Sequence, residues 1–347
     1  MTLQLTKEWD KIFPKSDKVD HKKVTFKNHF GVEIAADMYT PKNIKGKLPA
    51  IAVSGPYGAV KEQASGLYAQ EMAERGFIAI AFDPSFTGES GGEPRFVSSW
   101  DLNVEDYQAA VDFLSNEPNV DPEKISIIGI CGWGGVALET ACIDTRIKAT
   151  ICSTMYNIPR IRTNGYFDSE DTAEKRQEKR IAVNKQRTED FRNGEMKLQG
   201  GVPKKLPEDV DLPQFQKDYW DFYETPRGYH VRSLNSNDGW AASGSISLMN
   251  CKAFSFANEI QNAVMIVHGE KAHSRYMGED AFVQMTGHIF ETDNAPAPYT
   301  GNAPVGETRE GNKELLIIEG ASHCDLYDQK DIIPFDKIEA FIEENIQ

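Results

Sequence analysis

The segment Ile127–Leu138 (IIGICGWGGVAL) places four glycines around a single cysteine, between two apolar runs. The run before the cysteine predicts a buried strand, and the run after it predicts a helix. Glycines are needed where a backbone turns sharply and neighbouring segments approach closely. A strand–turn–helix unit with the pattern G-x-nucleophile-x-G is typical of a nucleophile elbow. The bulky Trp133 stands at the second glycine position, but Gly129, Gly132, Gly134 and Gly135 supply the small residues, so Cys131 is a candidate nucleophile. The alternative is a glycine-rich crossover in which Cys131 is a passive side chain.

The rest of the chain alternates short apolar runs with amphipathic segments. Continuous apolar runs predict strands that are buried on both faces of a parallel sheet, and alternating runs near the start predict an antiparallel hairpin at its edge. Strand–helix–strand alternation favours a doubly wound α/β fold, a mostly parallel central sheet flanked by helices. The predicted strands are Val24–Phe26, Val32–Tyr39, Leu48–Ser54, Gly76–Phe82, Lys124–Gly129, Ile147–Ser153, Ala263–His268 and Lys313–Glu319, and the predicted helices include Ala64–Arg75, Trp100–Asn116 and Val136–Ala141.

The strand pattern is interrupted between residues 157 and 262, where the sequence is charged and helical. We therefore expect an α/β core of residues 20–156 and 263–347, with residues 157–262 inserted as a helical lid or cap. The charged helix of the insertion is most simply a solvated surface. Trp240, Tyr219 and Phe222 are candidates to line a substrate pocket, although the interior of the lid explains them as well. A second long irregular stretch, Glu291–Asn312, joins the last two predicted strands.

Charge and cysteine usage exclude several function classes. The formal net charge is -15, which argues against nucleic acid or an anionic membrane as the main partner. The five cysteines are scattered and form no C-x-x-C pair, so a zinc cluster is not expected. The start has no basic segment followed by an apolar core, and no apolar stretch approaches the ~18 residues of a membrane span. These features predict a cytoplasmic protein with free thiols.

A catalytic base and an oxyanion hole have candidates at the expected places. His323 lies in the segment EGASHCD directly after the last predicted strand, from which a loop can carry it to the elbow. The residue after the nucleophile, Gly132, can give one oxyanion-hole N–H. The second is expected from the turn after Ser54, where Pro56 has no N–H and Tyr57 is the candidate, with Gly58 as the alternative.

With these elements in order, the chain resembles the α/β-hydrolase superfamily, and most closely its dienelactone hydrolase-like branch, in which cysteine replaces serine. The loop FDPSFTGESGG that begins at Phe82 is similar to a D-x-x-G-x-G-x-S loop of that superfamily. The resemblance covers about Val24–Ser153 and Ala263–Gln347. It implies a Cys–His–acid triad that hydrolyses an ester or lactone through an acyl-thioester.

The sequence departs from that family at two positions. Family members carry an aspartate in the turn after the penultimate strand, where this chain has Ala272. Glu270, two residues earlier, is the expected triad acid. Less favoured orienting groups for His323 are Glu279, Asp280 and Asn157.

The second departure concerns activation of the thiol. The glutamate that dienelactone hydrolases carry near the nucleophile is matched here by Gly55, and Glu62 is placed differently. We therefore expect Cys131 to be activated by His323 and by the helix N-terminus, which lowers a thiol pKa.

The resulting expectation is a hydrolase that takes a small ester or lactone and needs no cofactor. Acyl transfer is the alternative within enzymes. The alternative outside enzymes is a binding protein that has lost turnover, favoured by Ala272. A metal-dependent hydrolase is the least favoured, because His268, His273 and His288 lack a familiar ligand spacing. The sequence leaves the oligomeric state open, a homo-oligomer included.

Overall fold

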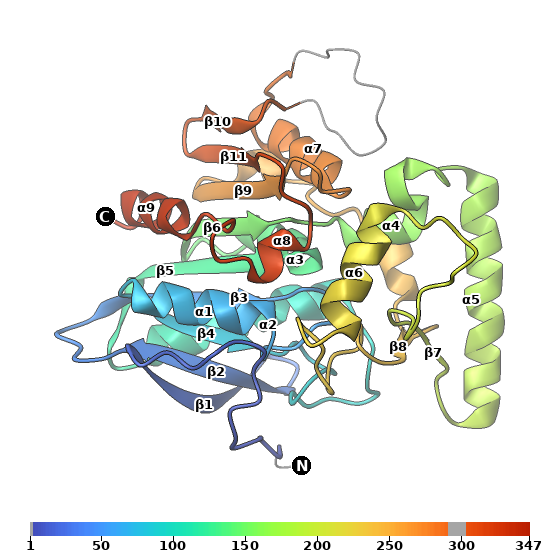
Figure 1. Ribbon diagram of the computed structural model, residues 1–347, viewed down its shortest axis with the longest axis horizontal. Helices are drawn as coiled ribbons and strands as arrows, with labels where there is room; N and C mark the ends of the chain where they lie inside the picture. Colours follow the sequence, from blue (N-terminus) through green and yellow to red (C-terminus); the bar gives the residue numbers. More distant parts are fainter. Residues whose placement is uncertain (1–2, 291–302) are drawn as a thin grey trace.

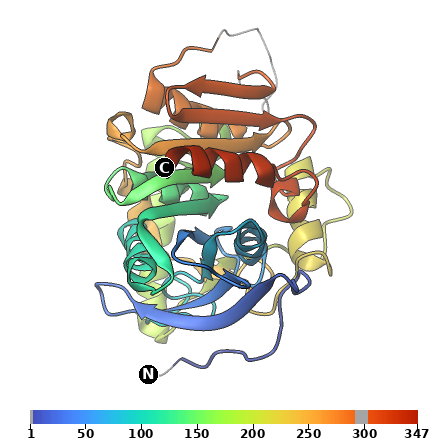
Figure 2. The ribbon, with the colours of Figure 1, turned by 90° about the vertical axis from the view of Figure 1, so that its left-hand side faces the viewer.

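The computed structural model describes residues 3–290 and 303–347, which build one nine-stranded sheet and a separate two-stranded one. The order of the large sheet is β1-β2-β4-β3-β5-β6-β9-β11-β10, and Figures 1 and 2 show it running from β1 at the bottom to β10 at the top. Its strands are β1 (Val19–Lys27), β2 (Glu33–Pro41), β3 (Leu48–Ser54), β4 (Ile78–Phe82), β5 (Val120–Ile130), β6 (Ile147–Ser153), β9 (Ala263–Gly269), β10 (Gly306–Glu310) and β11 (Lys313–Ile318).

The centre of the sheet is parallel and its two ends are antiparallel. Strands β4, β3, β5, β6, β9 and β11 pair in parallel, whereas β1–β2, β2–β4 and β10–β11 pair antiparallel. Strand β4 is buried along its whole length, as its continuous apolar sequence predicts for a strand covered on both faces. The α/β-hydrolase fold expected from the sequence is thereby confirmed.

Helices cover both faces of the sheet. Contacts place α1, α8 and α9 on one face and α2, α3 and α7 on the other. Their buried stripes are the apolar residues found at helical spacing, such as Tyr107, Val111 and Leu114 of α2. The bounds are α1 (Ala64–Glu74), α2 (Trp100–Asn116), α3 (Gly132–Ala141), α7 (Arg275–Thr286), α8 (Asp325–Asp328) and α9 (Phe335–Asn345).

A long insertion separates the neighbouring parallel strands β6 and β9, and Figure 1 shows it gathered beside the sheet, on the right. Helix α5 at its outer edge is charged and largely exposed, with only Asp190 buried. No helix in the described part of the chain is long and apolar enough to cross a bilayer. The insertion comprises α4 (Ile158–Asn164), α5 (Ala173–Asn193), β7 (Leu198–Gly200), α6 (Gln214–Glu224), β8 (Gly239–Ala241) and the 3₁₀ helices Tyr166–Asp168, Ile246–Asn250 and Ala257–Glu259.

The stretch Glu291–Asn312, expected to be irregular, contains an edge strand. Strand β10 pairs antiparallel with β11, from Gly306 opposite Ile317 to Glu310 opposite Lys313. Its sequence GETRE is polar and mostly exposed, so it lacks the apolar run on which the strand predictions relied. Residues 291–302 of the expected irregular stretch lie outside the described residues.

Candidate active site

The predicted strand–turn–helix unit lies in the middle of the sheet. Cys131 connects β5, the fifth strand across the sheet, to α3, and its backbone has φ 58° and ψ -125°. A non-glycine residue in the left-handed region is strained, which is typical of a functional turn. Gly129 makes the turn possible, because a Cβ there would lie 2.0 Å from the carbonyl oxygen of Trp133. Strand and helix therefore cross at a distance that only glycine allows.

The Cys131 thiol is protonated at neutral pH. The residue is 6% exposed, and burial raises the pKa of its thiol to about 11. Hydrogen bonding by the Tyr327 hydroxyl and by the N–H groups of Gly132 and Tyr57 acts against this rise. The expectation of a lowered thiol pKa at the helix N-terminus is therefore wrong, because desolvation outweighs it. The same contacts place the two N–H groups predicted for an oxyanion hole around the sulfur.

The structure explains why the activating glutamate of the dienelactone hydrolases has no equivalent here. At Gly55, φ is +106° and a Cβ would lie 2.2 Å from the carbonyl oxygen of Ile130, so no side chain fits. Glu62 does not replace it, since its carboxylate Oε1 is bound 2.8 Å from Lys61 Nζ and 2.8 Å from Arg232. Cys131 consequently has no carboxylate among its hydrogen-bonding partners in the described part of the chain.

Two hydroxyl groups hold the ring of His323. Its Nδ1 lies 2.7 Å from Thr154 Oγ1 and 2.8 Å from Ser274 Oγ, and its Nε2 lies 2.9 Å from the Tyr327 hydroxyl. The ring is buried, and this burial lowers its pKa well below the usual value, with smaller contributions from His273 and His268. His323 is therefore neutral at physiological pH.

The predicted contact between Glu270 and His323 is wrong. The Glu270 carboxylate instead accepts the Gly320 N–H at 2.8 Å. Because both ring nitrogens of His323 are already bound to hydroxyl groups, Glu270 has no free position on the ring. Ala272, at the position of the family aspartate, is buried.

The three less favoured candidates for orienting the His323 ring are also bound to other groups. Asp280 pairs with Arg160 at 2.6 Å, and Glu279 pairs with Arg275 at 2.8 Å. Asn157 caps α4 by accepting the Arg160 N–H at 3.0 Å. In the described part of the chain, no carboxylate is hydrogen-bonded to the His323 ring.

Tyr327 connects the histidine to the cysteine. It lies in α8, four residues after His323, and its hydroxyl contacts both His323 Nε2 and the Cys131 thiol. Sequence reasoning missed this tyrosine, although its spacing of one helical turn after the histidine was a usable signal. It also missed Thr154, the residue after β6, and Ser274, the residue before α7, because a hydroxyl residue at a strand or helix end is usually a turn or cap.

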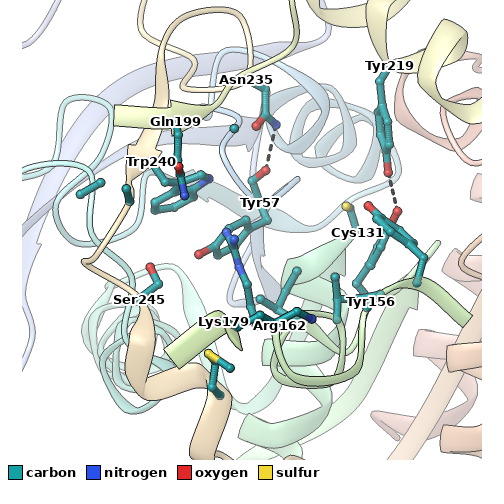
Figure 3. Close-up of a pocket in the computed structure, with 18 of the residues that line it drawn as sticks. Tyr57, Cys131, Tyr156, Arg162, Lys179, Gln199, Tyr219, Asn235, Trp240 and Ser245 are labelled. Atoms are coloured by element: carbon teal, nitrogen blue, oxygen red, sulfur yellow. Dashed lines mark hydrogen bonds between the residues drawn. The ribbon is translucent and has the colours of Figure 1, made fainter. Parts of the chain in front are cut away.

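A cavity of about 810 Å³ opens on the sulfur of Cys131 (Figure 3). Trp240 and Tyr219 line it, as expected from the sequence; Trp240 stacks on Tyr57 with ring centroids 4.2 Å apart, and the Tyr219 hydroxyl lies 2.7 Å from that of Tyr156. Phe222 does not line it, because it is fully buried against Tyr327 with ring centroids 5.0 Å apart. Most of the lining comes from the insertion, so this segment shapes the cavity.

The three histidines considered for a metal site do not form one cluster, because His288 has a different partner from the other two. His288 follows the end of α7 and pairs with Glu310 at 2.9 Å, whereas His268 and His273 are buried near His323. In residues 3–290 and 303–347, no group of three or more His, Cys, Asp or Glu side chains is arranged to hold a metal ion.

Comparisons with known proteins agree with this fold. The chain is 48% identical over 352 residues to the uncharacterised protein PA2218 of Pseudomonas aeruginosa, covering 100% of this chain and 86% of that protein. A crystal structure of PA2218 matches with a TM-score of 0.89 over 99% of each chain. The α/β hydrolase GrgF from Penicillium sp. sh18 matches with a TM-score of 0.68 over 94% of this chain and 99% of its own, at 18% identity.

Shorter segments of the chain match two fungal enzymes, a thiohydrolase and a polyketide transferase. Thiohydrolase aneE of Aspergillus aculeatus is 36% identical over 103 residues, 30% of this chain and 32% of that protein. Polyketide transferase claH of Penicillium crustosum is 30% identical over 133 residues, 38% of this chain and 43% of its own. A family model described as X-Pro dipeptidyl-peptidase (S15 family) matches residues 31–270, which include the elbow and both predicted oxyanion-hole residues. The chain therefore belongs to the X-Pro dipeptidyl-peptidase (S15) family of α/β hydrolases.

Proposed function

We propose that this protein hydrolyses a carboxylic ester or lactone through a thioester formed on Cys131. The observation that carries the proposal is the position of that sulfur. It stands at a strained turn, has the N–H groups of Tyr57 and Gly132 around it, and opens on a cavity of about 810 Å³. In this proposal those two N–H groups bind the oxyanion, and residues 157–262 act as the lid that selects the substrate.

The position of Tyr327, hydrogen-bonded to His323 and close to the Cys131 thiol, supports a proton path from Cys131 to His323 through its hydroxyl. In the neutral site, His323 donates Nδ1–H to the hydroxyls of Thr154 and Ser274 and accepts the Tyr327 hydroxyl proton at Nε2. The Tyr327 oxygen can then accept the Cys131 S–H proton. As sulfur bonds to the carbonyl carbon, the thiol proton moves to Tyr327 and the tyrosine proton moves to Nε2, leaving an imidazolium and an oxyanion.

The same path completes the cycle. When the tetrahedral intermediate collapses, the imidazolium returns its proton through Tyr327 to the departing alkoxide, leaving an acyl-thioester and an alcohol. Water then attacks the thioester, and its proton reaches His323 by the same route. Collapse of this second intermediate releases a carboxylic acid, and the proton returns to the Cys131 sulfur.

Thr154 and Ser274 take the place of the triad acid in this proposal. Their hydroxyls fix the ring orientation and the tautomer, which are two of the tasks of a triad carboxylate. They stabilise an imidazolium less than a carboxylate does, because they carry no charge. The low pKa of His323 is in keeping with this neutral environment.

Acyl transfer is the second candidate, since the partial matches include a polyketide transferase and a thiohydrolase. Both reactions use the same acyl-thioester, and they differ in whether water or another nucleophile removes the acyl group. Added alcohols or amines separate them: a transferase gives an acylated acceptor, whereas a hydrolase gives the free acid.

The experiment compares the wild-type protein with Cys131→Ala on 4-nitrophenyl esters, lactones, thioesters and Gly-Pro-4-nitroanilide. We expect Cys131-dependent release of product from an ester or lactone, and intact-mass spectra in which the acyl group is attached to Cys131. Cys251→Ala is the matched control, because this half-buried thiol lies outside the cavity lining. Ester hydrolysis that persists in Cys131→Ala would contradict the proposal.

A further inference from the structure

The cavity contains a cation without a counter-ion. Arg162, in the last turn of α4, lines the cavity, and Figure 3 shows its side chain extending toward Tyr57. The residue is exposed to solvent, and within residues 3–290 and 303–347 its guanidinium forms neither a salt bridge nor a hydrogen bond with another side chain or the backbone. By contrast, Arg160 in the same helix is paired with two carboxylates, those of Asp168 and Asp280.

Two hydroxyl groups in the same cavity are also without partners. Ser245 is 9% exposed, and its Oγ has no hydrogen-bond partner in the described part of the chain. The Tyr57 hydroxyl is buried and equally unpartnered. Buried polar groups are normally hydrogen-bonded, so unsatisfied donors that line a cavity indicate where a polar ligand group binds. Both hydroxyls are drawn on the Trp240 side of the cavity, away from the Cys131 sulfur (Figure 3).

The other charged side chains of the cavity do not neutralise Arg162. Lys179 and Glu170 also line it, but they pair with each other at 2.6 Å. The lining is therefore left with one positive charge. Because a guanidinium binds a carboxylate through two parallel N–H···O bonds, a carboxylate is the anion that this arrangement fits best.

From this we infer that the substrate is an ester that carries a carboxylate, held by Arg162 with help from the hydroxyls of Ser245 and Tyr57. The inference rests on the proposed ester hydrolysis at Cys131 and specifies its substrate class. A carboxylate-binding cavity also differs from the binding site that a dipeptidyl-peptidase substrate needs. Such a substrate presents a free N-terminal ammonium, which an unpaired guanidinium repels.

The test uses pairs of esters that differ only in charge. Mono-(4-nitrophenyl) adipate and its methyl ester place the carboxylate or its neutral form on the acyl side. 4-(Butanoyloxy)benzoate and its methyl ester place it on the leaving group. We expect kcat/KM to be tenfold or more higher for the charged member of one pair, and the pair that shows this preference identifies the side of the substrate that meets Arg162.

Substitutions of Arg162 test whether this residue causes the preference for the charged ester. Arg162→Met should remove the preference for the charged ester, mainly through KM, and leave the neutral ester unchanged, whereas Arg162→Lys should retain part of it. Arg187→Met is the matched control, since this exposed arginine of α5 does not line the cavity. Equal kcat/KM for both members of both pairs in the wild-type protein would overturn the inference while leaving Cys131-dependent hydrolysis intact.

A binding measurement keeps the inference testable even without turnover. Cys131→Ser is titrated with adipate monomethyl ester and with dimethyl adipate in a calorimeter, with and without Arg162→Met. We expect only the charged ligand to bind, and its affinity to fall about tenfold or more in the Arg162→Met background. Binding that is insensitive to Arg162, or that is equal for the two ligands, overturns the inference whatever the ester assays show.

Discussion

At the scale of single residues, the proposed chemistry depends most directly on Tyr327, whose hydroxyl lies 2.9 Å from His323 Nε2 and also contacts the Cys131 thiol. Tyr327→Phe removes one oxygen atom and keeps the ring. We expect kcat/KM for a Cys131-dependent ester to fall about 10²–10⁴-fold, the usual contribution of a positioned proton-transfer group. The rate of acyl-enzyme formation, measured in single-turnover experiments, should fall as well, because the thiol loses its route to the base.

A second buried tyrosine provides the control for this substitution. Tyr107 is fully buried and donates its hydroxyl proton to the Ile128 carbonyl at 2.8 Å, on the side of α2 rather than in the cavity. Tyr107→Phe should therefore lower stability slightly and leave kcat/KM within about twofold. If Tyr327→Phe acylates as fast as the wild-type protein, the histidine takes the thiol proton directly and the relay through tyrosine is wrong.

At the scale of elements, the elbow depends on how closely α3 crosses β5. Because a Cβ at Gly129 would lie 2.0 Å from the Trp133 carbonyl oxygen, Gly129→Ala forces strand and helix apart. We expect the free energy of unfolding to fall by about 2–3 kcal/mol, as measured by urea denaturation. Gly91→Ala is the comparison, since its Cβ would meet its nearest atom, the Glu33 carbonyl oxygen, at 3.3 Å. If the free energy of unfolding falls no more in Gly129→Ala than in Gly91→Ala, strand β5 and helix α3 can move apart at little cost and the argument from close crossing is wrong.

The elements that the sequence predicted are those with a strong apolar signal. Strands β3, β4 and β5 bury both faces, so their apolar runs predicted them directly, and the glycines around Cys131 predicted the turn. Strand β10 was missed because it lies at the edge of the sheet and is held by backbone pairing with β11. Its sequence GETRE has neither an apolar run nor an apolar/polar alternation from which a strand could be predicted.

The residues around His323 show why the site was only partly predictable. The position of a histidine directly after the last predicted strand follows from the order of elements, so the sequence placed His323 at this end of the sheet, where the structure has it near Tyr327. Its partners Thr154 and Ser274 come from two different strand-to-helix connections that meet only in the folded chain. A family-based search looks for a carboxylate, and it selected Glu270, which the fold directs to the Gly320 N–H instead.

At the scale of the whole molecule, a buried network of charges joins segments that are far apart in sequence. Lys61 Nζ lies 2.8 Å from Glu62, 2.7 Å from Asp83 and 2.7 Å from Glu89. Burial alone lowers the pKa of Lys61, but these carboxylates outweigh it and raise the pKa well above its usual value. Arg232 of the insertion joins the same network through Glu62 at 2.8 Å, so the insertion, β1 and the loop after β4 are linked through these charges.

Lys61→Met tests whether this network is needed for stability. The substitution keeps most of the length of the side chain but leaves the buried Asp83 carboxylate without its cation, whereas Glu62 and Glu89 keep Lys23. We expect the free energy of unfolding to fall by about 3–5 kcal/mol at pH 8. The loss should be smaller at pH 5. A buried carboxylate deprived of its cation has a raised pKa, so it takes up a proton in the folded state as the pH falls, and that uptake favours folding. Urea denaturation at both pH values measures the difference.

Two further variants show whether the loss of stability in Lys61→Met comes from the missing charge or from the packing of the side chain. Lys61→Met combined with Asp83→Asn should recover part of it, because the carboxylate that pairs with Lys61 alone in the described part of the chain is then neutral. Lys148→Met, which removes a partly exposed lysine 3.8 Å from Glu123, should cost less than about 1 kcal/mol. A loss in Lys61→Met that is equally large at pH 5 and pH 8, and unchanged by Asp83→Asn, would mean that packing of the lysine stem, rather than its charge, holds these segments together.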